Sequence, residues 1–466
     1  MAASDQVQIG GQIGGQIGGQ IGGQIDGQID GQIDGQIDGQ EQGLSGFRIQ
    51  AVFCAITINL LDGFDVLAIS FAAPSIATQW ALSPERLGLL FSVGLLGMVL
   101  ASVFVAGIAD YVGRRRAILA SLILVTVGMI GSALSESVTT LASWRFLVGA
   151  GVGIIVPSLN TLVAEFAPAK RRDFAIAAMQ SGYPAGGILG GLVAVVVISS
   201  MGWRGIFWVG AGLSLVAWLA ALRFLPESMD FLIARRTKDA LPRLNAIRSR
   251  LALPVLTELP PAPERVTNTQ GYRALLTPDV ALRTAALSLA FFFVMASFYF
   301  VANWTPKLLV DSGLKLSVGL SGGIVLSLGG IFGGLLLGWF AARYHARILT
   351  AVFMLLTAPA MWVFSQNNSL ELMLASAFVM GIFLLGSMVG LYVLTPGLFA
   401  APVQATATGV GVGLGRLGAI VGPLASGYLI ASDWNMTQLY GAFGLPVLLS
   451  AGMILWLHRH ILCGVE

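Results

Sequence analysis

The sequence predicts an all-α membrane protein in which twelve transmembrane helices form two six-helix bundles, and three observations support this prediction. Hydrophobic residues make up 56% of the 466 residues, charged residues only 11%, and the mean hydropathy is +0.82, values that no soluble domain of this length would show. Apolar stretches of about twenty residues recur along the chain, each long enough to cross a hydrocarbon core roughly 30 Å thick. One long polar interruption divides these stretches six and six.

The chain begins with a polar repeat. From Gln8 to Gly39 the tetrapeptide Gln-Ile-Gly-Gly, later Gln-Ile-Asp-Gly, recurs with almost no variation. Glycine at this density makes ordering costly, and one isoleucine in four residues leaves little apolar surface to bury. We therefore expect residues 1–47 to form a disordered tail. A β-solenoid or calcium-binding array is disfavoured, because the period is too short and only the second half of the repeat carries aspartate.

The twelve apolar stretches follow in order, each expected to form one transmembrane helix. Their approximate extents are 49–73, 87–109, 116–134, 141–164, 174–198, 204–224, 283–305, 318–342, 348–364, 370–395, 405–430 and 437–458. The interruption after the sixth stretch carries many arginines and several prolines, so we interpret it as an extramembrane linker. The predicted domains are thus an N-terminal bundle at 48–224, a linker at 225–282 and a C-terminal bundle at 283–466.

Basic residues are concentrated in alternate loops. Their clusters are Arg114-Arg115-Arg116, Lys170-Arg171-Arg172, the linker, Arg343 with Arg347, and His458-Arg459-His460. The intervening loops carry only scattered basic residues. Because Lys and Arg near span ends favour the cytoplasmic side, this asymmetry predicts that both termini and the linker are cytoplasmic.

The first apolar stretch contains an unusual pair of carboxylates, Asp62 and Asp65, in the run Asn59-Leu60-Leu61-Asp62-Gly63-Phe64-Asp65. A charged side chain at the middle of a bilayer costs about 2.5–3.5 kcal/mol on insertion scales, so intramembrane acids usually face a cavity, a partner or a proton path. Positions three apart lie on one side of a helix, and Gly63 between them leaves room for close packing. The pair therefore predicts a functional site.

Between the second and third stretches stands Asp110-Tyr111-Val112-Gly113-Arg114-Arg115-Arg116, which resembles the G-x-x-x-D-R-x-G-R-R loop of the major facilitator superfamily. Tyr111 replaces the usual basic residue, and the upstream Gly107 is one position off. In such a loop, the acid at the helix end and the basic residues after the glycine turn can form ion pairs with neighbouring helices. These pairs can stabilise one conformation of a transporter.

This resemblance implies a gating loop formed by Asp110, Gly113, Arg114 and Arg115, with Glu165 at the end of the fourth span as part of the same network. The corresponding loop of the second half, residues 338–347, lacks the acid, so any latch is asymmetric.

Several further stretches together resemble the aromatic acid:proton symporter family within that superfamily. They are Asp62-Gly63-Phe64-Asp65, Gly182-Tyr183-Pro184-Ala185-Gly186, Pro226-Glu227-Ser228, Asn303-Trp304-Thr305-Pro306, Val310-Asp311-Ser312-Gly313 and Gly415-Arg416-Leu417-Gly418-Ala419-Ile420-Val421-Gly422-Pro423. The resemblance implies proton-driven import of benzoate, hydroxybenzoate or a related aromatic acid by alternating access, in the inner membrane of a bacterium that degrades such compounds.

A symporter for an organic anion needs a cation for the carboxylate and a protonatable group near the midplane. We expect Asp62 and Asp65 to carry the proton and Arg416 to bind the substrate carboxylate, because arginine offers a planar, permanently charged fork. Asn303 and Trp304 are predicted substrate contacts, although Trp304 alternatively marks the outer membrane interface. Arg145 either tunes the charge of the two acids or pairs with one permanently to orient helices.

Other functions compete with this reading. A symporter for another organic anion or a sugar, or a drug/proton antiporter, is the nearest alternative, and a membrane sensor or enzyme is a more distant one. Antiporters of the superfamily typically carry a glycine-proline motif in the fifth helix, whereas Gly422-Pro423 lies in the eleventh. We expect no enzymatic activity, metal, catalytic residue or cofactor besides protons as the coupling ion. The expected partners are the aromatic acid and the lipid bilayer, not nucleic acid, and the expected state is a monomer.

Overall fold

Twelve apolar helices make up most of the part of the protein that the structure describes. The computed structural model describes residues 45–105, 108–168, 172–261, 277–341, 343–367, 369–399 and 401–463. Twelve helices within these ranges are long and apolar enough to cross a membrane, which confirms the predicted fold class. The repeat up to residue 44 lies outside the described residues, so the expected tail stays a prediction.

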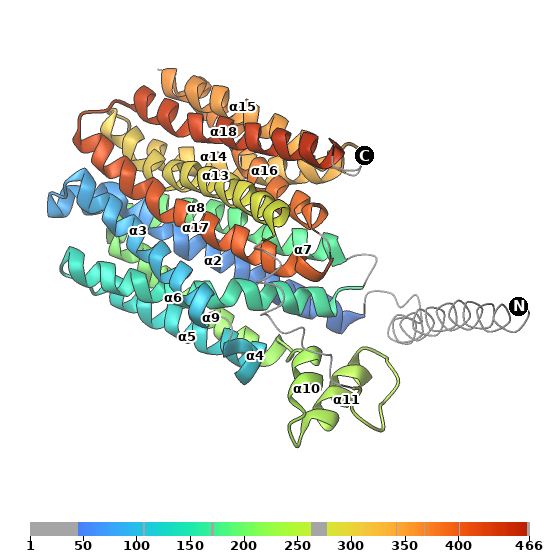
Figure 1. Cartoon of the computed structure of the whole chain (residues 1–466). Helices are drawn as coiled ribbons and strands as arrows, with labels where there is room; N and C mark the ends of the chain where they lie inside the picture. The colour runs from blue at the N-terminus through green and yellow to red at the C-terminus, as the bar shows by residue number, and fades with distance from the viewer. Residues whose placement is uncertain are drawn as a thin grey trace, which may run out of the picture.

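The N-terminal half supplies six spans, with the fifth in two pieces. Its elements are α2 (Gly46–Trp80), α3 (Pro84–Leu100) continued by a short π-helix (Ala101–Val105), α4 (Ala109–Val112), α5 (Arg114–Ala133), α6 (Val138–Phe166), α7 (Arg172–Gln180), α8 (Gly182–Met201) and α9 (Arg204–Phe224). Helix α2 packs along α8 and α9, and α5 packs between α6 and α9 (Figure 1).

The C-terminal half repeats the six-span arrangement. Its elements are α13 (Pro278–Asp311), α14 (Leu316–Ala341), α15 (Ala346–Gln366), α16 (Leu370–Leu394) with a 3₁₀ turn (Thr395–Leu398), α17 (Ala401–Ala431) and α18 (Met436–Cys463). Helix α13 lies against α17 and α18, and α16 lies between α14 and α15. Between the halves, α10 (Met229–Arg235) and α11 (Ala240–Arg250) stand beside one end of the bundle.

The first span is longer than the predicted 49–73. Ser45 caps its start by accepting a hydrogen bond from the Arg48 backbone N–H at 3.4 Å. The helix then continues through Pro74 to Trp80, and Thr78 donates its hydroxyl to the Pro74 carbonyl at 2.9 Å. A proline inside a transmembrane helix is tolerated when the surroundings satisfy the freed backbone groups, so Pro74 does not end the span.

The two halves meet through α2 with α13, α3 with α17, and α8 with α14. Ser70 donates to the Ala302 carbonyl at 2.7 Å, and Ser92 donates to the Ile420 carbonyl at 2.8 Å. Gly88 lies so close to the Pro423 carbonyl that an added Cβ would be 2.7 Å from its oxygen. These contacts lie at the span ends opposite the loops that carry the basic clusters, so the halves are joined at that end.

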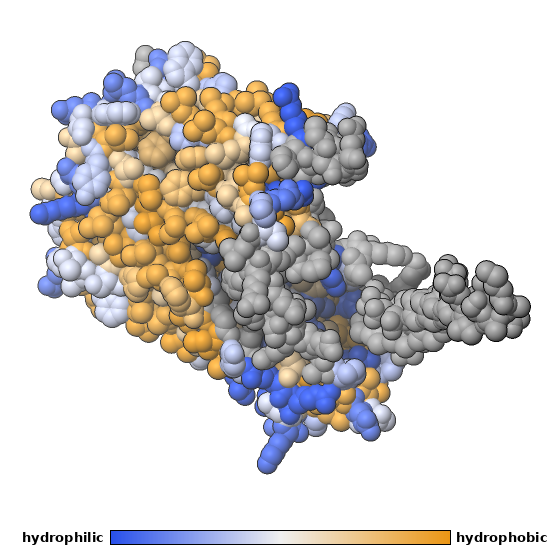
Figure 2. All heavy atoms as spheres, in the orientation of Figure 1, coloured by the Kyte–Doolittle hydropathy of each residue, from blue (hydrophilic) through white to orange (hydrophobic). Residues whose placement is uncertain are grey.

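The outer surface has the polarity that a bilayer requires. Figure 2 shows hydrophobic side chains over the flank of the bundle, and hydrophilic ones at its ends and around α10 and α11. Large apolar side chains such as Phe104 and Val196 are mostly exposed on this surface. Exposure on this scale is expected where lipid, rather than water, covers the protein.

Candidate functional site

The two intramembrane carboxylates stand where α2 presses most closely on α8. A Cβ added to Gly63 would lie 2.0 Å from the Tyr183 carbonyl oxygen, and one added to Gly186 would lie 1.9 Å from the Leu60 carbonyl oxygen. Glycine at both positions therefore allows the backbones to touch, as small residues do at membrane helix interfaces. Nearby, Asn59 donates its amide to the Met179 carbonyl at 2.7 Å, which fixes α7 to the same helix.

Asp62 and Asp65 are both buried, with exposed fractions of 6% and 2%. The Ser214 hydroxyl on α9 donates to Asp65 Oδ2 at 3.3 Å. Among the described residues, Oδ1 of Asp62 and Oδ1 of Asp65 have no hydrogen-bond partner. Since buried polar atoms are nearly always satisfied, both free oxygens mark positions that a proton, a water molecule or a ligand can occupy.

Arg145 approaches Asp65 from α6, but it forms no ion pair with the carboxylate, which was one of the two alternatives for this residue. Its Nη2 donates to the Asp65 backbone carbonyl at 2.7 Å, and its Nη1 contacts the Met129 sulfur at 3.6 Å. The guanidinium also lies 5.8 Å from the centre of the Phe207 ring. The arginine is only 4% exposed and interacts electrostatically with the Asp65 carboxylate. Its predicted charge-tuning role stays a prediction, and the geometry adds a role in bracing α2.

Arg416 lies on α17, in the other half of the molecule. It interacts electrostatically with Asp62, Tyr299 and Tyr392. It forms no hydrogen bond or ion pair with any residue that the structure describes, which distinguishes it from Arg145. A partly buried guanidinium with its donors free is suited to bind a carboxylate from a ligand.

Tyr183, on α8, brings a further polar group toward this region. Its ring faces Phe298 across the junction of the halves, with ring centres 6.5 Å apart. Its hydroxyl is buried beside the Tyr299 hydroxyl of α13, and it interacts electrostatically with Asp62. The groups around Asp62 thus include a carboxylate, a phenol and a guanidinium drawn from both bundles.

Asn303 and Trp304 are buried on α13, but their donors are engaged within the protein. Asn303 donates its amide to the Tyr299 carbonyl at 2.9 Å, and Trp304 donates its indole N–H to the Pro423 carbonyl at 3.1 Å. The Trp304 ring also meets Phe91 edge-on at 5.4 Å. Trp304 is 1% exposed and therefore does not face the membrane interface, and its ring contact with Phe91 crosses between the halves. The predicted substrate contacts of Asn303 and Trp304 stay a prediction.

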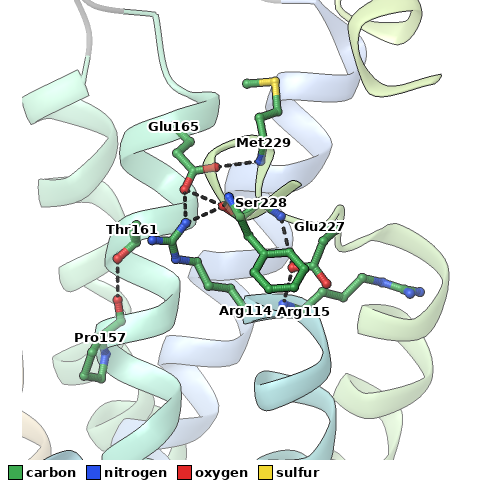
Figure 3. A network of polar contacts seen from close by, with 9 residues as sticks. Arg114, Arg115, Pro157, Thr161, Glu165, Glu227, Ser228 and Met229 are labelled. Carbon is green, nitrogen blue, oxygen red and sulfur yellow. Dashed lines mark hydrogen bonds and ion pairs between the residues drawn. The ribbon is translucent and has the colours of Figure 1, made fainter. Parts of the chain in front are cut away.

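A second cluster of polar contacts lies at the end of the bundle that carries the basic loops (Figure 3). Arg114 pairs with Glu165 Oε1 at 2.7 Å and also bonds to the Ser228 hydroxyl. Glu165 Oε1 accepts from the Ser228 hydroxyl at 2.8 Å, and its Oε2 accepts from the Met229 N–H at 2.9 Å. Glu165 and Arg114 thus lie in one network, as the sequence suggests.

The glycine of the predicted gating loop fits closely against this cluster. Gly113 has φ = 105°, a conformation that favours glycine, and an added Cβ would lie 2.5 Å from Glu227 Oε2. Glu227 Oε1 accepts from the Arg115 backbone N–H at 3.0 Å, and the Arg115 guanidinium donates to the Leu222 carbonyl at 2.6 Å. The side chain of Asp110 lies outside the described residues, so its role stays a prediction.

Four residues contribute to these clusters without having been assigned a role from the sequence: Tyr183, Ser214, Glu227 and Ser228. Glu227 and Ser228 belong to the Pro226-Glu227-Ser228 stretch, which carried a family resemblance but no chemical role. Tyr183 likewise belongs to a stretch that resembles the family, Gly182-Tyr183-Pro184-Ala185-Gly186, without having been given a chemical role. No sequence pattern singles out Ser214, because a serine in an apolar helix usually donates to a carbonyl of its own helix and so predicts no contact with another helix. No group of three or more potential metal ligands occurs in the described ranges.

Two six-helix bundles that meet around buried charged groups, with a polar network at one end, define a multi-pass membrane transporter. The family model described as Major Facilitator Superfamily matches residues 55–367. The chain therefore belongs to the major facilitator superfamily. The inward-open structure of the xylose transporter of E. coli superposes with a TM-score of 0.71 at 18% identity, covering 87% of this chain and 95% of that one, which supports the fold.

Several proteins with similar sequences are transporters of aromatic acids. The benzoate transport protein of Acinetobacter baylyi is 28% identical, covering 87% of this chain and 88% of its own length. The 4-hydroxybenzoate transporter of Pseudomonas aeruginosa is 28% identical, covering 89% and 93%. The 3-(3-hydroxy-phenyl)propionate transporter of Escherichia coli is 29% identical, covering 86% and 91%.

Proposed function

We propose that this protein imports an aromatic carboxylate, such as benzoate or a hydroxybenzoate, together with protons by alternating access. Similarity to aromatic acid transporters over nearly 90% of the chain supports the substrate class. The site adds a chemical reason, since Asp62, Tyr183 and Arg416 combine a proton carrier, a phenol and a cation. The expected cell location is the inner membrane of a bacterium with both termini cytoplasmic, and the expected working unit is a monomer.

The observation that carries the proposal is the partly buried guanidinium of Arg416, which pairs with no residue that the structure describes. A charge within a membrane span is costly, so a membrane protein that retains one gains from having it available to bind a ligand. Asp62 is the charged group of the N-terminal half with which Arg416 interacts. We infer that Arg416 binds the substrate carboxylate and that the arriving anion competes with Asp62 for the arginine.

This competition supplies a coupling mechanism. When the substrate anion neutralises Arg416, Asp62 loses the favourable field that stabilises its charged form, so the fully loaded site favours a protonated Asp62. Asp65 accepts a hydrogen bond from Ser214 and lies beside Arg145, and the charges that act on it are those of Arg145 and Asp62, not that of Arg416. We therefore propose that Asp62 couples directly to substrate and that Asp65 relays or retains a proton.

Alternating access then requires the two ends of the bundle to open in turn. In the present conformation the halves are joined by Ser70 and Ser92 at the end opposite the basic loops. With the proposed orientation, that is the outer end. The network of Glu165, Arg114 and Glu227 joins the N-terminal bundle to the start of the linker, and we propose that it stiffens this half as it rocks against the other.

Uptake into proteoliposomes tests this function. A proton gradient, inside alkaline, should drive accumulation of labelled benzoate or 4-hydroxybenzoate, and a protonophore should abolish it. Asp62→Asn and Asp65→Asn should lose gradient-driven accumulation, while Arg416→Ala should lose binding of the carboxylate. Concentrative uptake retained in both Asn variants, or unchanged ligand affinity in the arginine variant, would contradict the proposal.

The same assay separates the competing functions. Accumulation of xylose or a dicarboxylate in place of aromatic acids would indicate another symporter, and export of a cationic drug would indicate an antiporter. A sensor or an enzyme would not concentrate substrate on an imposed gradient. Because the matched family and the similar proteins are transporters, we propose transport without catalysis.

A further inference from the structure

A hollow on the lipid-facing surface lies apart from the site described above. Its volume is about 320 Å³, and it lies between α2 and α9. The lining residues are Gln50, Phe53, Cys54, Thr57, Ile58, Ala217, Ala220 and Phe224. Phe53 and Phe224 are 67% and 42% exposed and form raised walls, whereas the alanines of α9 have side chains too short to fill the space between them. We call this hollow the α2–α9 groove.

The α2–α9 groove opens within one leaflet of the bilayer. It follows the first turns of α2 and the last turns of α9, so it lies at the end of the bundle that carries the basic loops. The lining residues of α2 run from Gln50 to Ile58, which corresponds to about 12 Å along a helix axis at 1.5 Å per residue. Half of a hydrocarbon core of roughly 30 Å has a similar depth, so the groove matches one leaflet.

Two arginines lie over aromatic rings near the loop-proximal end of the groove, one ring lining the groove and the other lying on α2 just before the first lining residue. The Arg223 guanidinium lies 5.6 Å from the centre of the Phe224 ring, and Phe224 lines the groove. The Arg250 guanidinium lies 5.5 Å from the centre of the Phe47 ring, one helical turn before Gln50. Both arginines are exposed, and neither forms an ion pair with an acidic residue that the structure describes.

We propose that the α2–α9 groove binds an acyl chain of an anionic phospholipid whose headgroup lies between Arg223 and Arg250. The apolar walls suit the chain, the amide of Gln50 at the loop-proximal end of the lining suits the glycerol esters, and two arginines that pair with no described acidic residue suit a phosphate with further negative charge. Arg223 belongs to the N-terminal bundle and Arg250 to the linker helix α11, so one bound lipid joins these two parts of the chain.

Arg343 provides a matched control. Its guanidinium lies 4.4 Å from the centre of the Trp339 ring, near the end of α14, and it is exposed like the other two arginines. It does not border the α2–α9 groove. A general attraction between basic residues and the membrane surface would involve all three arginines, whereas a specific site involves only Arg223 and Arg250.

Native mass spectrometry of the purified full-length protein tests the proposal, with phosphatidylglycerol and phosphatidylcholine added separately. The wild-type protein should retain phosphatidylglycerol more strongly. Arg223→Gln and Arg250→Gln should each weaken that retention about fivefold, and together about 25-fold, because a basic residue near an anionic headgroup contributes about that factor. Retention of phosphatidylcholine should change little in these variants. Arg343→Gln should behave as wild type, with thermal unfolding of every variant confirming that it folds.

A second variant acts on the apolar part alone. Ala220→Phe fills the groove and leaves both arginines in place, so it should lower retention of both lipids. Equal retention of the two lipids by the wild-type protein, or unchanged phosphatidylglycerol retention in the double arginine variant, would overturn the proposal. A photoreactive residue at position 220 that crosslinks to residues 1–44 instead of lipid would also overturn it, because the chain's own N-terminal segment would then be the occupant.

Discussion

The contact between Gly63 and Tyr183 makes a sharp prediction about both stability and transport. An alanine at position 63 would place its Cβ 2.0 Å from the Tyr183 carbonyl oxygen, whereas an ordinary contact begins at 3.4 Å. The two helices must therefore separate by about 1.4 Å, the difference between these distances. Backbone atoms cannot rotate away as a flexible side chain can, so the whole of α8 has to shift relative to α2.

This separation has an energetic and a functional consequence. Overpacking of this kind costs about 1–3 kcal/mol, which exceeds the gain of up to about 1 kcal/mol from replacing a helical glycine with alanine. The shift also moves Tyr183 away from Asp62, the residue next to Gly63. We expect Gly63→Ala to unfold at a temperature several degrees lower than wild type and to lose most of its aromatic acid uptake.

Gly212, on α9, is the matched control for this variant. An added Cβ at that position meets nothing within 4 Å, so Gly212→Ala gains helix propensity without a clash and should be at least as stable as wild type. Thermal unfolding of detergent-purified protein and uptake into proteoliposomes measure both effects. Wild-type stability together with wild-type uptake in Gly63→Ala would refute the reasoning from helix contact.

Three further predictions follow from the same geometry. Glu165→Gln removes the charge paired with Arg114 and should cost about 1.5–3 kcal/mol, measured as a lower unfolding temperature; stability equal to wild type would argue against the network. Ser92→Ala leaves the Ile420 carbonyl without its donor and should favour opening at that end by about 0.5–1.5 kcal/mol, which distance measurements between spin labels on the two halves can detect. Tyr183→Phe removes a buried hydroxyl that lies beside the Tyr299 hydroxyl, so stability should fall by no more than about 0.5–1.5 kcal/mol while affinity for hydroxybenzoates falls relative to benzoate; an unchanged affinity ratio would exclude a contact between this phenol and the substrate.

The sequence alone predicts the spans well because their signal is local. A helix that crosses lipid must satisfy its own backbone and present apolar side chains, so hydropathy and length are sufficient to identify it. The ends of the spans are less well determined. Pro74 illustrates this, since the chain continues as a helix to Trp80 although the predicted span stops at residue 73.

The polar residues within the spans are a second feature that the sequence determines. Asp62, Asp65, Arg145 and Arg416 are conspicuous because each would be expensive in lipid. The free-energy cost of a charged side chain in lipid indicates that these four residues have a function, but it does not indicate which groups they contact. Arg145 shows the difference, because the sequence leaves open whether it pairs with a carboxylate, whereas in the structure it donates to the Asp65 backbone carbonyl.

Only the tertiary structure decides which groups meet. Gly113 and Glu227 are more than a hundred residues apart, yet the glycine leaves the space that the carboxylate occupies. Tyr183 reaches Asp62 because Gly63 lets α8 touch α2, and Arg416 reaches the same aspartate from the other bundle. The physical reason is that hydropathy acts on each segment separately, whereas contacts between helices depend on shapes contributed by distant parts of the chain.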